Sequence, residues 1–279
     1  MKLDIFRTLW GYSGDWMPVI DRLHSEGFEG IEARIPDPIA DRQRNRTALR
    51  DSGTPYIAVV FTSKPVLPDQ SASPEMHLAD LERKLGIAAE FAPRFVNILA
   101  GNDRWPLSAQ IDFFGRAIEL AEQSGVVCCF ETHRARLLGN PWQTLELIQH
   151  LPALRFTSDI SHWVVSCERL LNDSADDLSA FVERVHHVQA RVGYDQGPQV
   201  PHPAAPEYEE ALAFHRCHWE SVWSSQKARG YQATTMTPEF GPDGYLHHLP
   251  FTNVPVADLD SLNRWMARHE REHFMDFMG

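Results

Sequence analysis

Four short segments in the second half of the chain end in polar side chains that could bind a cation or move a proton. Apolar residues lead into Glu131, Asp159 and Glu239, and a fourth segment ends in HVQAR (187–191). If these segments are neighbouring parallel strands, three carboxylates and an amide or imidazole meet at one rim. Carboxylates that close repel one another and shift their pKa values, and a divalent cation relieves the repulsion. The pattern therefore predicts a metal centre.

Each of these residues also has a simpler interpretation. A single carboxylate after a strand commonly caps the next helix or forms a salt bridge. The metal centre is favoured because three acids converge, and no single one of them would predict it.

Short apolar runs alternate with helical patterns along the whole chain. Candidate strands cover residues 3–9, 30–35, 56–62, 95–101, 126–132, 154–160, 184–191 and 231–240. Helical periodicity marks the segments 15–27, 76–92, 111–125, 141–151, 211–230 and 256–274. Eight strands with intervening or trailing helices predict an α/β fold, a (β/α)8 TIM barrel, with residues 1–279 as a single domain.

An open doubly wound sheet is the alternative fold. No GxGxxG follows the first strand and no GxxxxGK[ST] occurs, so the usual nucleotide-binding motifs are missing. In a barrel, the catalytic groups lie at the carboxyl ends of the strands, which is where the four polar segments end.

Composition narrows the function classes. The net charge of −12 argues against binding by neutralisation of nucleic-acid phosphates. No run of about 18 apolar residues predicts a membrane span, and the first residues, MKLDIFRTLWGYSGDW, do not resemble a signal peptide. The four cysteines form no CxxC and are expected as buried, reduced thiols. We expect a soluble, cytoplasmic protein with a small-molecule ligand and with neither nucleic acid nor membrane as a partner.

The pattern of Glu, Asp-x-x-His, His-x-Gln and Glu on successive strands resembles the xylose isomerase-like TIM-barrel superfamily of sugar isomerases and epimerases. The segments FETHRARLLGNPWQTLEL, SDISHWVV, HVQARVGYDQGPQVP and TPEFGP resemble a bacterial branch described as sugar phosphate isomerase/epimerase-like. The resemblance implies a carbohydrate-metabolism enzyme that binds one divalent metal ion. Its substrate would be a sugar or keto acid.

The resemblance also chooses between the two candidate ligands on the seventh strand. His187 and Gln189 share one face of the strand, and hydroxypyruvate isomerases have glutamine at the second position. This implies Glu131, Asp159, Gln189 and Glu239 as metal ligands, with His187 deeper in the barrel. An oxygen-rich site favours Mn²⁺ or Mg²⁺. If His187 were the ligand, Co²⁺ or Zn²⁺ would fit better.

Two mechanisms isomerise sugars, a hydride shift and a proton transfer through an ene-diolate. None of the four lysines lies in a strand-end motif, so we expect proton transfer through a metal-stabilised ene-diolate. Similarity to tagatose/psicose 3-epimerases implies Glu131 and Glu239 as the acid/base pair. It also implies that His162 contacts a substrate oxygen.

Four further residues are expected to contact the substrate. They are His133, Arg191, Trp10 and Phe240. Arg191 would bind a carboxylate or hydroxyls, and the two aromatic residues would form an apolar floor or else belong to the core. The long loop VGYDQGPQVPHPAAPEY (192–208) is interpreted as a substrate cover or as a subunit contact in a homo-oligomer.

Three other functions stay open. The same site could serve a metal-dependent lyase or dehydratase acting on a keto-sugar, inositol or glycoside. An endonuclease IV-like DNA repair enzyme shares Glu131, Asp159, His162 and Glu239 but needs an Asp-x-His pair, which this chain does not have after its seventh strand. A non-catalytic sugar-binding barrel is the third alternative.

Overall fold

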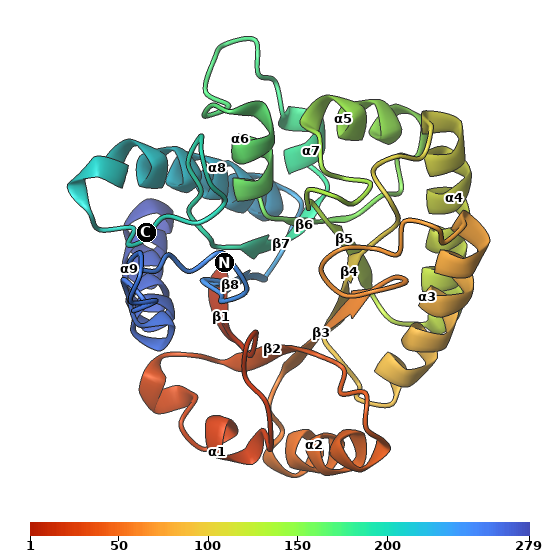
Figure 1. Cartoon of the computed structure of the whole chain (residues 1–279), viewed down its shortest axis with the longest axis horizontal. Helices are drawn as coiled ribbons and strands as arrows, with labels where there is room; N and C mark the ends of the chain where they lie inside the picture. The colour runs from red at the N-terminus through yellow and green to blue at the C-terminus, as the bar shows by residue number, and fades with distance from the viewer.

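The computed structural model describes residues 1–279 and contains a closed barrel of eight parallel strands (Figure 1). The strands are β1 (Lys2–Thr8), β2 (Gly30–Arg34), β3 (Tyr56–Phe61), β4 (Phe95–Leu99), β5 (Cys128–Glu131), β6 (Phe156–Ser158), β7 (Val185–Gln189) and β8 (Ala233–Thr237). The last strand pairs with the first, with Lys2 beside Ala233 and Ile5 beside Met236. The predicted barrel is confirmed, and the open sheet is ruled out by this closing pair.

Helices surround the barrel on its outside (Figure 1). They are α1 (Met17–Ile20), α2 (Ile39–Ser52), α3 (Pro74–Ala89), α4 (Leu107–Ser124), α5 (Pro141–His150), α6 (Ser161–Cys167), α7 (Ser179–Val182), α8 (Glu209–Ala228) and α9 (Leu259–Met278), with the 3₁₀ turns η1 (His24–Glu26) and η2 (Pro206–Tyr208). Side-chain caps fix several starts: Ser73, Asn140 and Asp258 accept backbone N–H groups of α3, α5 and α9. These caps fix where the helices start, and the buried faces of the helices pack against the strands.

The segment 15–27 differs from the predicted helix. It forms only the single turn α1 and the turn η1, and Gly27 then adopts a left-handed φ of 87°. The apolar spacing misled the prediction because Trp16, Val19, Ile20 and Leu23 are all buried, although the backbone between them is not continuous helix. Short irregular segments can bury the same residues as a helix.

The inside of the barrel is apolar at one level and polar at the next. Phe6, Ile57, Phe95 and Cys129 form a separate cluster with no exposed surface. Because side chains alternate along a strand, residues two positions further on face the interior as well. Asn97 follows Phe95 in this way, and Glu131 follows Cys129. The barrel is thus closed by an apolar layer, with buried polar groups towards the carboxyl ends of the strands.

Two other expectations can be compared with the structure. Cys128 and Cys129 are buried and burial raises the pKa of the Cys128 thiol to about 12. Cys167 is only partly buried and Cys217 is exposed, so the expectation of four buried thiols was wrong for these two. None of the helices has the length and apolar character needed to span a membrane.

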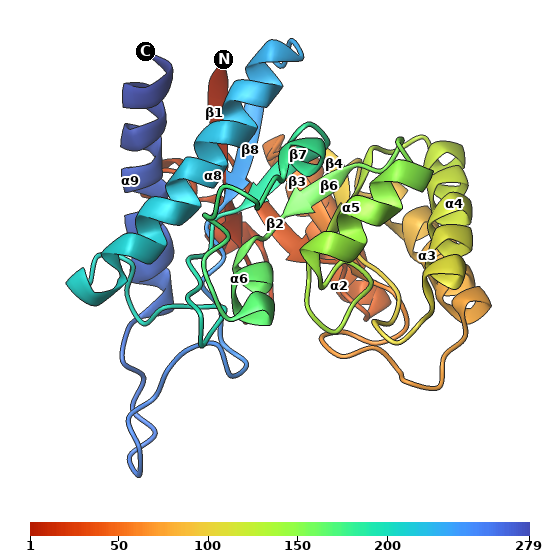
Figure 2. The same ribbon diagram turned by 90° about the horizontal axis from the view of Figure 1, so that it is seen from above.

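One segment projects away from the barrel. Between β8 and α9 the chain extends beyond the carboxyl ends of β1 and β8 (Figure 2). Its two arms meet at an isolated bridge between His248 and Pro255. Phe251 near its tip is fully exposed, while Asp243 and Tyr245 at its base line the main pocket.

Candidate functional site

Three carboxylates meet at the carboxyl ends of β5, β6 and β8. Glu131 ends β5, Asp159 follows β6, and Glu239 lies two residues beyond β8. Each offers an oxygen within 4.8 Å of those of the other two. Glu131 and Asp159 are buried, and the Glu239 side chain is only 16% exposed. The residues that the sequence analysis grouped are therefore neighbours in space.

Burial and mutual repulsion shift the pKa values of these acids. Burial, then the charges of Glu239 and Asp159, raise the pKa of Glu131 well above its usual value. Burial raises the pKa of Glu239 to about 8, although Arg191 opposes the shift. Three buried carboxylates at this spacing can all be ionised only if positive charge lies among them, and a divalent cation would supply that charge.

Gln189 presents its amide oxygen without a partner. Its Nε2 donates to Glu32 Oε1 at 2.6 Å, so the amide group is turned and its Oε1, which is buried, accepts no hydrogen bond. Three carboxylates and an amide oxygen are a hard donor set of the kind that Mg²⁺ and Mn²⁺ prefer. The residues present fit such an ion.

His187 lies one layer deeper on the same face of β7. It shares a hydrogen bond of 2.8 Å between Nδ1 and Thr235 Oγ1, and its Nε2 is 3.3 Å from Glu32 Oε2. It belongs to neither of the groups of side chains that could hold a metal ion. This placement agrees with its interpretation as a barrel-interior residue.

Two buried polar residues of the site were missed in the sequence. Glu32 on β2 accepts from Gln189 and, at 3.3 Å, from Asn97 Nδ2 on β4. The Asn97 amide also donates to Glu131. A continuous network therefore joins two predicted ligands, Gln189 and Glu131. A carboxylate and an amide inside otherwise apolar strands were the signal that could have revealed it.

His133 and His162 form the wall beside the carboxylates. Their rings lie 3.9 Å apart, and together with Glu131 they make a second group that could hold a metal ion. Burial lowers the pKa of His133 to about 3 and that of His162 well below its usual value. Both imidazoles are therefore neutral at neutral pH and can donate or accept one hydrogen bond at each nitrogen.

Arg191 is tied to the protein rather than free for a ligand. Its Nη2 contacts Asp159 and lies 2.8 Å from His162 Nε2, and its Nε donates to Ser161 Oγ at 3.2 Å. Nη2 is also 3.7 Å from Glu239. The guanidinium, predicted to bind substrate, is buried and partly neutralises the carboxylates.

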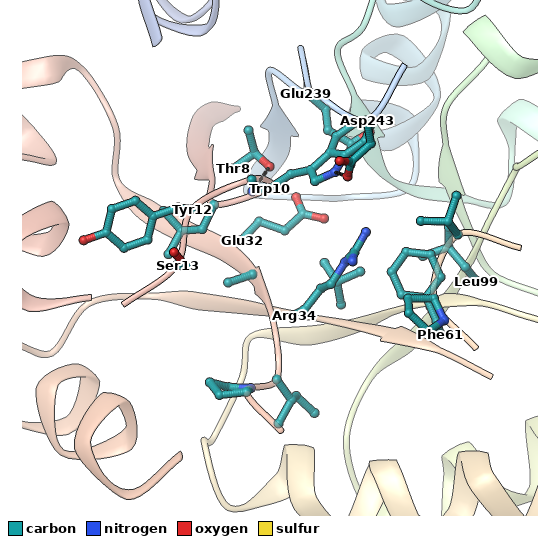
Figure 3. Close-up of a pocket in the computed structure, with 18 of the residues that line it drawn as sticks. Thr8, Trp10, Tyr12, Ser13, Glu32, Arg34, Phe61, Leu99, Glu239 and Asp243 are labelled. Atoms are coloured by element: carbon teal, nitrogen blue, oxygen red, sulfur yellow. Dashed lines mark hydrogen bonds between the residues drawn. The ribbon is translucent and has the colours of Figure 1, made fainter. Parts of the chain in front are cut away.

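A cavity of about 620 Å³ opens onto this cluster. Glu131, Glu239, His133 and Arg191 line it, and Glu32, Arg34 and Glu239 point into it from β2 and the end of β8 (Figure 3). A pocket of this size suits a small organic ligand.

Of the two aromatic residues expected to form an apolar floor, Trp10 lies in the cavity and Phe240 does not. Trp10 lines the cavity, donates from Nε1 to Asp243 at 2.8 Å and packs edge-on against Tyr245 with ring centroids 5.0 Å apart. Phe240 belongs to the buried core and does not line the cavity. The physical reason is that Asn263 binds both backbone groups of Phe240 and fixes the strand end against α9.

The loop 192–208 does not cover the cavity, and none of its residues lines it. Gln199 accepts from Gly241 N–H at 2.9 Å, and Gly193 N–H donates to His215 of α8. The loop is packed along the barrel rim, so its interpretation as a substrate cover was wrong. One lysine, Lys84 from α3, does reach the cavity wall, which a search of strand ends could not detect.

The comparisons with known proteins agree with this geometry. The sequence model of the family described as "Xylose isomerase-like TIM barrel" matches residues 20–252. The chain belongs to this family. This confirms the resemblance that the four strand-end motifs indicated. Comparison with curated proteins gives no match.

Solved structures share the fold of this xylose isomerase-like barrel at low identity. An L-ribulose 3-epimerase is 14% identical with a TM-score of 0.65, covering 100% of this chain and 98% of its own. A probable 3-DHS dehydratase from Bacillus anthracis is 15% identical with a TM-score of 0.61, covering 96% and 98%. A xylose isomerase-like TIM barrel protein from Mycobacterium smegmatis in complex with magnesium is 12% identical with a TM-score of 0.62, covering 97% of each chain.

Proposed function

We propose that the protein is a divalent-metal-dependent isomerase or epimerase of sugars or keto acids that works by proton transfer. The observation that supports this most is the group of three carboxylates whose oxygens lie within 4.8 Å of one another, two of which, Glu131 and Glu239, line a cavity of about 620 Å³. The buried amide oxygen of Gln189, which has no partner, adds a fourth candidate ligand. The L-ribulose 3-epimerase with the same fold and the magnesium complex of another family member support the proposal.

Glu131, Asp159, Gln189 and Glu239 would hold the ion, with Mn²⁺ or Mg²⁺ as the candidates. When bound, a divalent cation favours loss of a proton from the carbon beside a carbonyl, because it stabilises the negative charge that develops on oxygen. Proton transfer and orientation of the substrate would then be the work of side chains of the protein.

Glu131 and Glu239 would move the proton. They come from β5 and from beyond β8, both line the cavity, and each has an oxygen within 4.8 Å of the other. One carboxylate would take the proton from carbon and the other, protonated, would return one. Return to the opposite face of the same carbon inverts it. Return to the former carbonyl carbon relocates the carbonyl, if the proton of the neighbouring hydroxyl passes to the former carbonyl oxygen.

The neighbouring groups would orient the substrate. Neutral His133, which lines the cavity, can hydrogen-bond to hydroxyl groups without adding charge, and Trp10 offers a flat apolar face for a sugar ring. His162, which was expected to contact a substrate oxygen, is fully buried, does not line the cavity and has its Nε2 beside Arg191, so it would act by holding Arg191. Arg191 would hold Asp159 and Glu239 in place.

A lyase or dehydratase is the second candidate. It is favoured by the fold shared with the probable 3-DHS dehydratase and by the chemistry of the same carboxylate pair, since a carbanion beside a carbonyl can expel a leaving group. Glycosides, inositols and keto-sugars would be its substrates.

Product analysis separates the two candidates. The Mn²⁺-loaded protein is incubated with ketoses and keto acids, and the products are identified by NMR. An epimer or isomer of unchanged mass supports the proposal. An alkene with loss of water would assign the dehydratase instead, and no reaction of any compound, with Glu239→Gln as the inactive control, would count against both.

A further inference from the structure

Arg34 is a cation of the cavity that the proposed reaction does not use. It follows Glu32 by two residues on β2, so it faces the same side of the strand, nearer the rim. Its side chain points into the pocket between Glu32 and Phe61 (Figure 3). The guanidinium lies over the Phe61 ring, 4.6 Å from the centroid, and forms no hydrogen bond or ion pair with the protein. All five of its N–H donors are therefore available to a ligand.

The stacking fixes the position of Arg34 without consuming its donors. A guanidinium over an aromatic ring keeps its edge, where the N–H groups lie, open to solvent. Arg136 approaches the same ring at 5.5 Å, but it is buried and donates to the carbonyls of Thr62 and Lys64. Phe61 therefore packs against one arginine that donates to backbone carbonyls and one that has no partner in the protein.

The surroundings of Phe61 are positively charged. Lys84 also lines the cavity there, where it donates to the Phe61 carbonyl and pairs with Asp80 at 2.7 Å. The opposite wall carries the carboxylates Glu131 and Glu239. The cations Arg34 and Lys84 therefore line the cavity on the side of β2 and β3, where the acids Glu32, Asp37 and Asp41 also lie, and of these two cations only Arg34 has no acidic partner.

We propose that Arg34 binds a carboxylate of the substrate, so that the enzyme acts on an acidic ketose or keto acid and not on a neutral sugar. This rests on the proposed function, because it supposes that the carbonyl of the ligand lies at the carboxylate cluster. Arg191, to which the sequence analysis gave this role, has its Nε and Nη2 engaged by Ser161, Asp159 and His162, so it has fewer free donors than Arg34.

The adjoining loop favours a carboxylate over a phosphate. Phosphate sites are commonly built from consecutive backbone N–H groups. The segment after β2 reads Ile35-Pro36-Asp37-Pro38, and its two prolines have no N–H to offer. Asp37 also lines the cavity and would repel a dianion more than a monoanion. Asp41, on the same wall, is paired with Arg44 at 2.7 Å. A planar guanidinium alone matches a carboxylate through two parallel hydrogen bonds.

Matched ligands test the proposal at equilibrium. D-tagaturonate and D-fructuronate differ from D-tagatose and D-fructose by a carboxylate in place of the terminal CH₂OH. Calorimetric binding to the Mn²⁺-loaded protein is expected to be at least about tenfold tighter for one or both acids. Arg34→Gln should abolish this preference and Arg34→Lys should retain part of it. Arg46→Gln, which removes an arginine of α2 that pairs with Glu90 away from the cavity, should leave the preference unchanged.

Several results would overturn the carboxylate subsite. They are equal binding of acids and neutral ketoses, a preference that survives in Arg34→Gln, failure of both acids to bind, or tighter binding of D-fructose 6-phosphate than of D-fructuronate. Binding of an acid without any hydrogen exchange or product would leave the subsite supported and contradict the proposed reaction. Turnover of neutral ketoses that does not depend on Arg34 would support the proposed reaction and contradict the carboxylate subsite.

Discussion

At the residue scale, the orientation of the Gln189 amide group determines whether its oxygen is free to bind an ion. An ionised carboxylate accepts hydrogen bonds but cannot donate them. Gln189 therefore turns its NH₂ group towards Glu32 and its amide oxygen away from it. Partners of this kind, which hold a ligand without touching the ion, commonly change metal affinity by about 10- to 100-fold. Glu32 is in this sense a positioning residue.

The first prediction concerns that orientation. Glu32→Met removes both acceptor oxygens with little change of volume and should weaken Mn²⁺ binding by about tenfold or more. Glu32→Gln keeps one acceptor oxygen for Gln189 and should lose less. Calorimetric titration with Mn²⁺ measures both, with Asp41→Asn as a control that removes a cavity acid outside the network. Equal affinity in the wild type and Glu32→Met would show that the amide needs no such partner.

The sequence revealed the acids at strand ends but not the residues that orient them. Glu131, Asp159 and Glu239 stand out because each interrupts or follows an apolar run at a predictable rim. Glu32, Asn97 and Arg34 lie within or at the end of earlier strands, where a polar residue is equally compatible with an exposed face. Only the closure of the barrel gives Glu32 and Asn97 their partners, because it brings β2 close to β4 and β7.

At the element scale, tight packing between strand ends shapes the cavity. Gly241 lies just beyond β8, and a Cβ there would lie 2.0 Å from the Trp10 ring. The ring is held in place by Asp243 and Tyr245. The small residue therefore lets the end of β1 approach the end of β8.

The second prediction tests this contact. Gly241→Ala should displace the indole, reduce the stability by about 1–3 kcal/mol and weaken sugar binding. Chemical denaturation and tryptophan fluorescence measure the two effects. Gly115→Ala in α4, where a Cβ would meet no atom within 4 Å, should instead stabilise the protein by about 0.5–1 kcal/mol. If the two variants behaved alike, the close approach of Trp10 would not matter.

The third prediction concerns buried histidines of α8. His218 shares a hydrogen bond of 2.8 Å with Ser158 of β6, and burial lowers its pKa to about 3. In the unfolded chain the pKa is close to 6.5. As the pH falls below 6.5, the unfolded state takes up a proton that the folded state does not bind. The free energy of unfolding should therefore be complete above pH 6.5 and decrease as the pH falls towards the folded pKa.

Replacing the histidine isolates its contribution. Between pH 6.5 and 5, His218→Gln should lose about 1–2 kcal/mol less stability than the wild type, as measured by urea denaturation at each pH. His150→Gln, at an exposed position, should follow the wild type. A pH profile of His218→Gln identical to that of the wild type would mean that folding does not change the pKa of His218.

The elements themselves were largely predictable. All eight strands were placed within a few residues, because each is a short apolar run bounded by turn residues. The sequence failed for the segment 15–27 and for the loop 192–208. The apolar residues of 15–27 indicated a buried segment, and the prolines of 192–208 indicated an irregular one. Neither feature indicated which other element the segment packs against.

At the scale of the whole molecule, closure of the barrel links the two ends of the chain. β1 pairs with β8, and Arg271 of α9 donates to the Gly27 carbonyl at 2.9 Å. The largest core cluster includes residues from Leu3 to Phe274. We infer that the chain folds as one cooperative domain, since removal of either end would open the sheet.

The fourth prediction follows from this closure. Unfolding in urea should be a single transition, with coincident midpoints for far-ultraviolet circular dichroism and tryptophan fluorescence. Separate transitions for the two signals would indicate that one half of the barrel is stable without the other.

The most direct test of the proposed chemistry is deuterium exchange. The Mn²⁺-loaded protein is incubated in D₂O with ketoses and keto-hexuronates, and deuterium at the carbon beside the carbonyl is followed by NMR. We expect deuterium at that carbon for at least one substrate, with a rate at least about 100-fold lower in Glu239→Gln. Conversion of a substrate to its epimer or isomer with no deuterium from the solvent would contradict proton transfer by Glu131 and Glu239. The carbon-bound hydrogen would then move without leaving the substrate, as in a hydride shift.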